Sequence, residues 1–409
     1  MGKQIVIRAR VLYDGKKKLT EQTVIVEDGK IVEVSKKALK ADFEGYVTPA
    51  FIDAHSHIGM FRDGEPDSES EGNDISDQFM PMNDPLNSIY FDDRAFKDAI
   101  DFGVLYSCVV PGSGNLIGGR AMIIKNWAEN RKDALLKDYG YKMALGFNPR
   151  STGSWKGKRP NTRMGVYSML EEKFDKLLIK KEKAELERDK KLLEIEKKAK
   201  GKDKLSAKEI ALEKKNINRC FELSFEPEEL ITLDILSGKK TAKIHVHKED
   251  DVLYLIELVK KYKLKATADH TCDVFHKEIY EELAKAKIPV VFGPLGGIGG
   301  KIELAHAYYQ NAELLMKSKA EYGLMTDHPV IWTPHLRDSL KFFLINGMKD
   351  EEAISVITYK NAKILGIDDT LGTVEKGKIA SLIVWDKEPL NLAAFPKMVM
   401  AEGRILRKK

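Results

Sequence analysis

The chain contains 409 residues, with 68 Lys and Arg against 63 Asp and Glu and a formal net charge of +5. Its 43% hydrophobic residues exclude a wholly disordered chain and suffice for a large core, while no apolar run approaches the roughly 20 residues of a membrane-spanning helix. The N-terminus lacks the long apolar segment of a secretory signal, and three cysteines make no disulfide framework, so a reducing cytoplasm is expected.

Both ends of the chain show the pattern of short β-strands. Asp28-Gly29 separates two β-branched runs, residues 23–27 and 30–34, which is a strong hairpin signal. Near the C-terminus, residues 380–385 and 397–401 also read as strands. We therefore expect one composite β-sandwich domain built from residues 1–48 and 371–409.

Between these ends, apolar runs of strand length alternate with helical stretches. Strands connected by helices in this way are typical of an α/β fold, and eight of them predict a (β/α)₈ TIM barrel over residues 49–370. An open doubly wound sheet is the alternative. The eight predicted strands are residues 51–55, 104–110, 121–124, 143–147, 241–245, 265–268, 289–292 and 323–326.

A charged segment at about residues 171–220 interrupts this alternation. It is dominated by Leu, Glu and Lys, which favour exposed helices stabilised by Glu–Lys pairs. Gly201 is expected to end one helix, and Ser206 and Glu209 have the spacing of a capping box that begins the next. The segment carries 17 Lys and Arg and 12 Asp and Glu, which equals the whole net charge. We interpret it as a solvated helical hairpin, with a lid or an oligomer contact as alternatives.

Histidines gather where the predicted strands end. His55 and His57 close the first strand, and alternate residues of a strand face the same way, so both imidazoles can face one centre. The C-terminal ends of barrel strands meet on one face, where active sites are found, so these groups predict a site for a divalent metal. The other groups at strand ends are His245-Val246-His247, Asp269-His270 and Asp327-His328.

These motifs resemble the amidohydrolase superfamily, and most of all its imidazolonepropionase-related metal-dependent hydrolases. The resemblance covers nearly the whole chain outside the charged segment. It implies a (β/α)₈ barrel with a β-sandwich made from both termini, and a hydrolase that uses a bound metal. The motifs that carry it are residues 47–57, 243–247, 269–270, 326–329, 361–367 and 372–380.

The resemblance also implies roles for single residues. The implied metal ligands are His55, His57, His245 and Asp327. It implies that His270 either polarises the substrate carbonyl or binds a second metal, and His247 then lies beside the site as a substrate contact.

The types of ligand indicate which ion binds, and comparison with binuclear members of the superfamily bears on the number of ions. Zn²⁺ is the expected ion and Fe²⁺ the alternative. One ion is favoured over two, because the predicted end of strand four, residues 146–149, lacks the lysine that binuclear members use. Lys125, which follows the third predicted strand, could take the place of that lysine.

The expected reaction is hydrolysis of an amide-type C–N bond, in a cyclic amide or imide, an N-acyl amino acid or a dipeptide. Asp327 is expected to accept a proton from the metal-activated water and pass it to the leaving nitrogen, while His270 donates a hydrogen bond to the carbonyl oxygen. Lys248 stands where imidazolonepropionases and related deaminases carry an acidic residue, which argues against those activities. They remain alternatives, as does a non-catalytic scaffold.

The loop after the fourth predicted strand is rich in cations. Guanidinium groups bind carboxylates with two parallel hydrogen bonds, so Arg150 and Arg163 predict contacts with an anionic small-molecule substrate. Neither a membrane nor a nucleic acid is expected as a partner, and a homo-oligomer is kept open.

Overall fold

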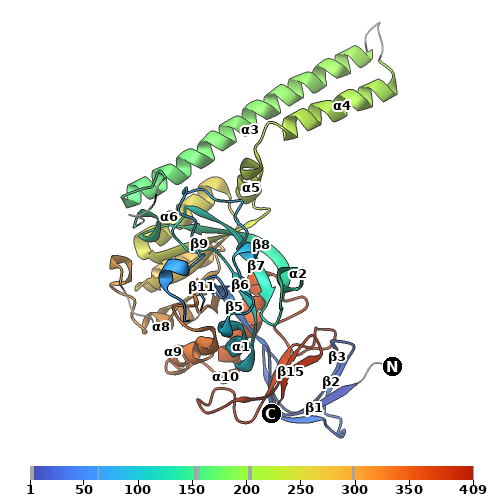
Figure 1. Cartoon of the computed structure of the whole chain (residues 1–409), viewed down its shortest axis with the longest axis vertical. Coiled ribbons are helices and arrows are strands. Elements are labelled where there is room, and N and C mark those ends of the chain that lie inside the picture. Colours follow the sequence, from blue (N-terminus) through green and yellow to red (C-terminus); the bar gives the residue numbers. More distant parts are fainter. Residues whose placement is uncertain are drawn as a thin grey trace.

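The structure is a computed structural model that describes residues 4–62, 64–151, 155, 157–200, 205–296 and 300–408. Its strands form two sheets, and a helical hairpin projects from the end of the molecule that lies away from the smaller sheet (Figure 1). All eight strands predicted for the barrel contribute to the larger, eight-stranded sheet. Its strands are β5 (Phe51–Ser56), β6 (Val104–Val109), β7 (Ile117–Lys125), β8 (Leu135–Ala144), β9 (Thr241–Lys248), β10 (Ala266–Asp273), β11 (Val290–Phe292) and β12 (Tyr322–Leu324), which neighbour one another in chain order.

The predicted TIM barrel is confirmed, with one strand reversed. β7 pairs antiparallel with β6 and β8, whereas the other neighbours in this sheet pair in parallel. Only residues 110–116 connect β6 to β7, too few for the helical crossover that a parallel pair needs. The C-terminal end of β7 therefore lies at the opposite end of the barrel from the ends of the other strands.

One side chain joins the two edge strands of the barrel, β5 and β12. The amide nitrogen of Asn361 donates to the carbonyl oxygens of Ile52 (2.6 Å) and Leu324 (2.8 Å), and its Oδ1 accepts from the N–H of Leu324 (3.0 Å). A Cβ atom on Gly323 would lie 1.8 Å from Asn361 Oδ1, so the absence of a side chain there makes room for the amide. The barrel is closed by a buried amide together with the glycine that accommodates it.

The second sheet combines strands from both ends of the chain, as predicted. It curls so that the N–H of Ile31 donates to the carbonyl of Lys378 (2.9 Å), and it encloses a core of its own that includes Val24, Leu382 and Met398. The seven strands form one curled sheet. The domain boundaries at residues 48 and 371 stay a prediction. In sheet order the strands are β15 (Arg404–Lys408), β14 (Pro396–Ala401), β13 (Leu382–Trp385), β4 (Phe43–Pro49), β1 (Ile5–Tyr13), β2 (Lys18–Glu27) and β3 (Lys30–Ser35).

Helices cover the outside of the barrel. The α6 helix, for example, presents Val252, Leu255 and Ile256 to the core beside β9 and β10. Along the described chain, no helix is both long enough and apolar enough to cross a bilayer. The helices of the body are α1 (Arg94–Asp101), α2 (Arg131–Ala134), α5 (Pro227–Leu236), α6 (Glu249–Tyr262), α7 (Lys277–Lys285), α8 (Asn311–Met316), α9 (Lys341–Leu344), α10 (Asp350–Ser355) and α11 (Asn361–Leu365).

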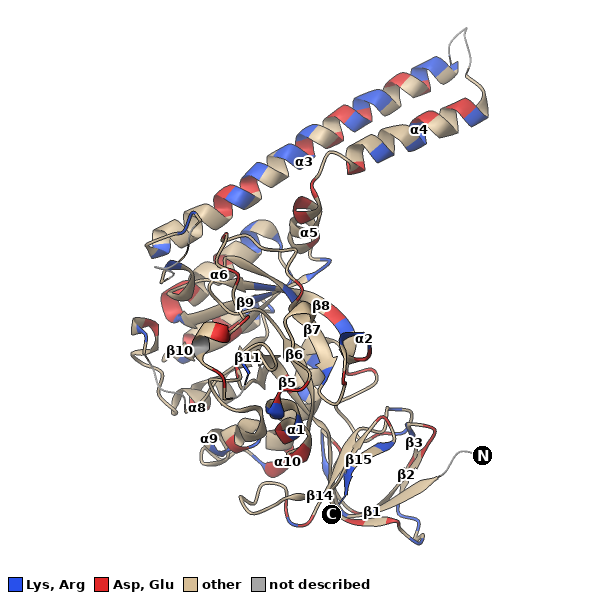
Figure 2. Ribbon diagram, viewed as in Figure 1, with Lys and Arg blue, Asp and Glu red and all other residues tan. Residues whose placement is uncertain are grey.

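The charged segment is helical, as expected, and lies between β8 and β9. It forms a long helix, α3 (Arg163–Lys200), followed by α4 (Ala207–Glu222), which runs back alongside it (Figure 1). The predicted capping box is confirmed, since the Ser206 N–H donates to Glu209 Oε2 (2.7 Å) and the Glu209 N–H to Ser206 Oγ (3.3 Å). Gly201, the predicted end of the first helix, lies outside the described residues. Lys, Arg, Asp and Glu cover the hairpin along its length (Figure 2).

Replacing Asn361 by Ala should destabilise the protein strongly. The change leaves two carbonyls and one N–H unpaired in a buried position, so we expect the free energy of unfolding to fall by about 2–4 kcal/mol. Urea denaturation followed by circular dichroism measures this change. The same replacement at Asn216, which is exposed on α4, is the control and should leave the midpoint unchanged. Equal midpoints for both variants would contradict the proposed role of Asn361 in closing the barrel.

Candidate metal centre

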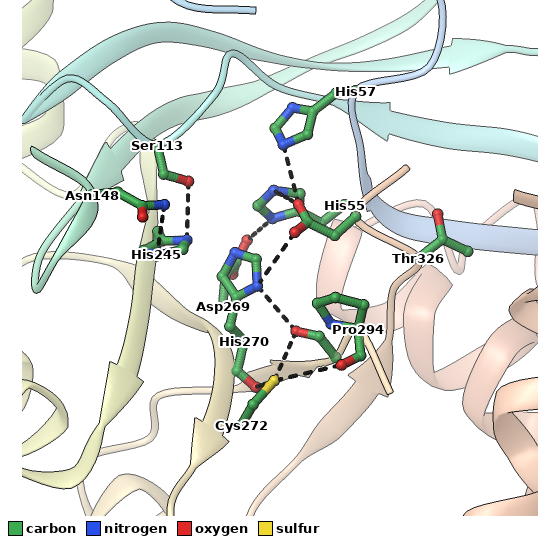
Figure 3. Close-up of polar contacts among 12 residues, drawn as sticks. His55, His57, Ser113, Asn148, His245, Asp269, His270, Cys272, Pro294 and Thr326 are labelled. Carbon is green, nitrogen blue, oxygen red and sulfur yellow. Dashed lines mark hydrogen bonds and ion pairs between the residues drawn. The ribbon is translucent and has the colours of Figure 1, made fainter. Parts of the chain in front are cut away.

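The histidines predicted at the strand ends do come together. His55 lies on β5 and His57 directly follows it, His245 and His247 lie on β9, and His270 lies on β10. All five are buried. Their rings form one continuous cluster, with centroids 5.3 Å apart for His55 and His57, 5.0 Å for His55 and His270, and 4.2 Å for His245 and His270. Asp327, which follows β12, completes the group. Figure 3 shows the polar contacts of His55, His57, His245 and His270.

The backbone around these residues is strained. His270, Thr271 and Asp327 have φ angles of 82°, 53° and 53°, in the left-handed region that favours glycine. Such conformations cost on the order of 1–3 kcal/mol each and persist only where the surroundings enforce them. For Asp327, the enforcing contact is its own N–H, which donates to the carbonyl of His55 (3.1 Å) across the closed barrel.

One ligand group consists of His55, His57 and Asp327. The Nδ1 atom of His57 donates to the carbonyl of Val110 (2.7 Å), and Nδ1 of His55 donates to Asp269 (2.6 Å). Both Nε2 lone pairs are therefore directed at Asp327 Oδ1, at 3.1 Å for His57 and 3.5 Å for His55. One ligand atom from each of the three residues lies within 4.8 Å of the others, a spacing that a metal ion can bridge.

The protonation states in this group suit a metal ion. Burial, reinforced by the charge of Lys142, lowers the pKa of His55 to about 3. Burial alone would raise the pKa of Asp327, but its contacts with His57 and His55 and the charge of Lys142 bring it down to about 2. At neutral pH the group therefore offers a neutral imidazole and an ionised carboxylate, the forms that bind metals.

A second ligand group consists of His245, His247 and His270, again with one ligand atom each within 4.8 Å. The Nδ1 atom of His270 donates to the carbonyl of Gly293 (3.0 Å), which leaves its buried Nε2 without a hydrogen-bond partner. Nδ1 of His245 lies 2.9 Å from Ser113 Oγ. Burial, followed by the neighbouring histidines, lowers the pKa of His270 well below its ordinary value. An inward-facing, unpartnered lone pair is what a metal ion would satisfy.

Sequence reasoning missed Lys142, because it began the fourth strand at residue 143, whereas β8 extends from Leu135 to Ala144. Lys142 is fully buried and its Nζ lies 2.9 Å from His55 Nε2. Burial lowers the pKa of this amine to about 8. The argument for a single ion, which rested on the absence of a lysine on strand four, was therefore wrong.

Lys125 cannot serve as the substitute that the sequence suggested. It ends β7, whose reversed direction takes it away from the site, and its Nζ pairs with Glu402 (2.9 Å) of the terminal sheet. The direction of a strand decides which end of it faces the metal centre, and the short connection before β7 was the one sequence signal of the reversal.

Buried charged residues next to the histidines fix their orientation. Asp269 accepts hydrogen bonds from His55 and from Thr267 Oγ1 (2.6 Å), and it pairs with Lys243 Nζ at 2.9 Å. Burial alone would raise its pKa, but the charge of Lys243 and the hydrogen bond from His55 hold it well below the usual range. The ionised Asp269 fixes the tautomer of His55, so that Nε2 remains available as a ligand.

A cavity of about 540 Å³ opens onto the centre. His247 and Asp327 line its inner wall, and much of the rest of the wall is apolar or aromatic, including Phe147, Leu295 and Tyr308. Lys301 is the one cationic side chain among the described residues of the lining. His247 thus lines the cavity and also belongs to the second ligand group, and its role as a substrate contact stays a prediction.

The two predicted arginines do not line this cavity. Arg163 begins α3 and its guanidinium is held by Asp251 (3.0 Å) and Asp250 (3.2 Å) of α6, so its prediction as a substrate contact was wrong and its role is to join two helices. Arg150 lies in a short 3₁₀ helix with its guanidinium 5.4 Å from the ring centroid of Phe147. The cationic side chain that lines the cavity is Lys301, and not Arg150 or Arg163.

Glu303 is a further residue that sequence reasoning missed. It is buried in a 3₁₀ helix after β11; its Oε2 accepts from the N–H of Phe147 (2.7 Å), and its Oε1 lies 3.7 Å from His245 Nε2. Burial raises its pKa to about 7. A Cβ on Gly146 would lie 2.6 Å from this carboxylate, so glycine there makes room for it.

Comparisons with known proteins agree with this geometry. The sequence model of the amidohydrolase family matches residues 209–406. An amidohydrolase of Hapsidospora irregularis, tasK, is 25% identical over 93% of this chain and 39% of its own length, and an imidazolonepropionase of Pseudomonas savastanoi is 29% identical over 42% of the chain and 43% of its own length. The chain thus spans about two fifths of the length of these curated relatives. A solved structure of an amidohydrolase from Thermotoga maritima has a TM-score of 0.84 at 27% identity, covering 99% of this chain and 100% of its own.

Replacing Asp269 by Asn should weaken metal binding. The change removes the charge that orients His55, and partners of this kind typically contribute about 10-fold to 100-fold in metal affinity. Competition with a chromophoric chelator measures that affinity. Asp251→Asn is the matched control: this carboxylate is also buried and ion-paired, but with Arg163, so it should leave the affinity unchanged. Equal losses in the two variants would show a general structural effect instead.

Proposed function

From the similarity to the amidohydrolase family and the geometry of the site, we propose that the chain is a metal-dependent hydrolase of an amide-type C–N bond that uses two divalent ions. The observation that carries this proposal is the orientation of the histidines. Hydrogen bonds at Nδ1 of His55, His57 and His270 leave their Nε2 atoms available as ligands. Two groups of three ligands, which share no residue, are assembled in this way at the strand ends.

The donor set fits two ions. His55, His57 and Asp327 would hold one, and His245, His247 and His270 the other, with Zn²⁺ favoured by the imidazole-rich set. Lys142 touches His55, and its charge also lowers the pKa of His245 and His270, so it lies near both groups. We propose that its amine adds CO₂ and loses a proton, giving a carbamate whose oxygens would be further ligands for the ions. When bound, such ions polarise the scissile carbonyl and lower the pKa of a water molecule toward about 7.

The chain's own residues then supply positioning and proton transfer. Asp327 lines the cavity, and its carboxylate is placed to accept a proton from the attacking water and return it to the leaving nitrogen. His270 is not suited to donate a hydrogen bond to the substrate carbonyl, because its one proton is on Nδ1, bound to Gly293. His247, besides serving as a ligand, is the histidine that lines the cavity, so we propose that the bound substrate lies against it.

The cavity favours a substrate with an apolar body and one anionic group. Phe147, Leu295 and Tyr308 would contact the apolar part, and Lys301 would bind a carboxylate. An N-acyl amino acid or a dipeptide with an apolar side chain meets both requirements. The ligand groups are complete in the described chain, which argues against a non-catalytic scaffold on this fold.

A cyclic amide of the imidazolonepropionase type is the second candidate. Lys248, at the place of the acidic residue of those enzymes, pairs with Asp250 (3.5 Å) and is half exposed, which argues against it. Glu303 is the observation in its favour, since this buried carboxylate lies 3.7 Å from His245 Nε2 and could replace the missing acid.

Removal of the metal should abolish hydrolysis, and about two ions per chain should restore it. Lys142→Ala should lower the bound metal and reduce kcat by about 100-fold or more, because the carbamate ligands are lost. Elemental analysis together with a screen of N-acyl amino acids, dipeptides and cyclic amides tests both statements. Lys125→Ala is the matched control and should retain its ions. Full metal content with unchanged turnover in Lys142→Ala would refute the two-ion site.

Replacing Lys301 by Gln should raise KM for substrates with a free carboxylate by about 10-fold to 100-fold, the value of a charge-assisted hydrogen bond. Substrates whose carboxylate is capped as an amide should show no such change. Steady-state kinetics measures KM for pairs of substrates that differ only in whether the carboxylate is free or capped. Lys317→Gln, which removes an exposed lysine paired with Glu313, is the control. Equal effects on both members of a pair would remove Lys301 from substrate recognition.

A further inference from the structure

The cavity over the metal centre changes character from its inner end to its mouth. At the inner end the lining is buried, and His247 and Leu295 are only 4% and 8% exposed. Tyr308, Tyr309 and Val330 belong to the same lining, yet they are 54%, 50% and 53% exposed. These three side chains therefore stand at the mouth, and they are here called the cavity rim.

The cavity rim is aromatic and apolar surface that the protein itself leaves half uncovered. Tyr309 packs against Phe342, with 6.0 Å between the ring centroids, so the rim is supported from behind. Exposed apolar side chains that gather at the mouth of a cavity favour a ligand that extends out of it. The apolar part of a substrate can therefore continue beyond the cavity of about 540 Å³.

The charges of the lining are few and of unequal availability. In the part of the chain that the structure describes, Lys301 and Asp327 are the only charged residues that line the cavity. Lys301 is half-buried and forms no ion pair with another described residue, so its ammonium is available to an anion. Asp327 lies against the Nε2 atoms of His57 (3.1 Å) and His55 (3.5 Å). Glu303, the other carboxylate near the centre, is buried and does not line the cavity.

This distribution of charge separates two kinds of substrate that the proposed function leaves together. In a dipeptide, the carbon next to the scissile carbonyl carries an amino group that is largely protonated at pH 7. The carbonyl must lie against His247 and Asp327 to react, so the ammonium would enter the buried end of the cavity. No free carboxylate of the described lining awaits it there, and a charge that leaves water without a partner is costly.

We propose that the substrate is an N-acyl amino acid whose only charge is its carboxylate and whose acyl group is apolar. This inference rests on the proposed function and narrows it, because a dipeptide with a free amino group is disfavoured. Lys301 binds the carboxylate, the buried end holds the scissile amide, and the cavity rim contacts the outer part of the acyl group. Hydrolysis consumes one water molecule and releases the amino acid and the carboxylic acid of the acyl group.

A matched pair of substrates tests the charge. N-propionyl-L-leucine and L-alanyl-L-leucine differ only at one hydrogen, which the dipeptide replaces by an ammonium group. We expect kcat/KM of the metal-loaded protein to be about 10-fold to 100-fold higher for N-propionyl-L-leucine, because the ammonium loses its hydration without gaining a partner. An equal or higher value for L-alanyl-L-leucine would overturn the proposal.

The length of the acyl group tests the cavity rim. N-octanoyl-L-leucine should exceed N-propionyl-L-leucine in kcat/KM by about 10-fold or more, since each methylene that leaves water contributes up to about 4-fold. Tyr309→Ser should lower the ratio of these two values several-fold. Leu212→Ser, which changes an exposed apolar residue of α4, is the matched control and should keep the ratio. A ratio near one in the wild-type protein, or a ratio that Tyr309→Ser leaves intact, would contradict the role of the rim.

Binding measurements keep this inference apart from the proposed function. Ketomethylene analogues of the matched pair, in which CH₂ replaces the scissile N–H, bind without being cleaved. Calorimetry on the metal-loaded protein should give a Kd about 10-fold to 100-fold lower for the propionyl analogue than for the alanyl analogue. If no amide is hydrolysed, the proposed function fails, while the order of the two Kd values still decides the inference. Equal or tighter binding of the alanyl analogue would overturn the inference even in an active hydrolase.

Discussion

The closure of the barrel between β5 and β12 is the constraint on which the metal centre depends. The N–H of Asp327 donates to the carbonyl of His55, and the N–H of His57 donates to the carbonyl of His328, both at 3.1 Å. These two bonds bring ligands from the first and last strands of the barrel together. Asn361 secures the seam one layer below, where its amide bonds both edge strands. Ligand geometry and fold stability are therefore determined by the same contacts.

The buried charges beneath the histidines show what this geometry requires. Removing Lys142, Lys243 and Asp269 from water is costly, and buried ion pairs are in general weak contributors to stability. Here they act on the histidines instead. Asp269 is held ionised by Lys243 and in turn fixes the proton of His55 on Nδ1. The interior of this barrel is thus charged where an ordinary barrel interior is filled by branched apolar side chains. These charges fix which nitrogen of His55 carries the proton, and so leave the other nitrogen free to bind a metal ion.

The helical hairpin follows different physics from the barrel. Its helices are stabilised locally, by the capping box at Ser206 and by ion pairs one turn apart such as Lys191 with Glu187 (2.6 Å). The net charge of the protein resides in this segment and says nothing about the enzyme body. What distinguishes the hairpin is a row of exposed apolar side chains, Ile179, Leu186 and Leu193, among its charges.

The sequence alone determined the barrel, the terminal sheet, the hairpin and most histidines of the candidate metal centre, because each of these depends on local patterns. Alternation on a strand brings His55 and His57 to one side, and the C-terminal ends of parallel strands meet without further information. The capping box of α4 is equally local. The family resemblance added the roles of single residues, which periodicity cannot supply.

Only the tertiary structure decided which charged groups enter the site. Lys142 and Lys125 are both lysines on barrel strands, and the reversal of β7 sends one to the centre and the other to the far end. Arg163 and Lys301 could both have met an anion, but Asp250 and Asp251 hold the first while the second lines the cavity. Glu303 reaches His245 from a loop distant in sequence. Ion pairing between distant segments is set by packing, and the linear order of residues does not encode it locally.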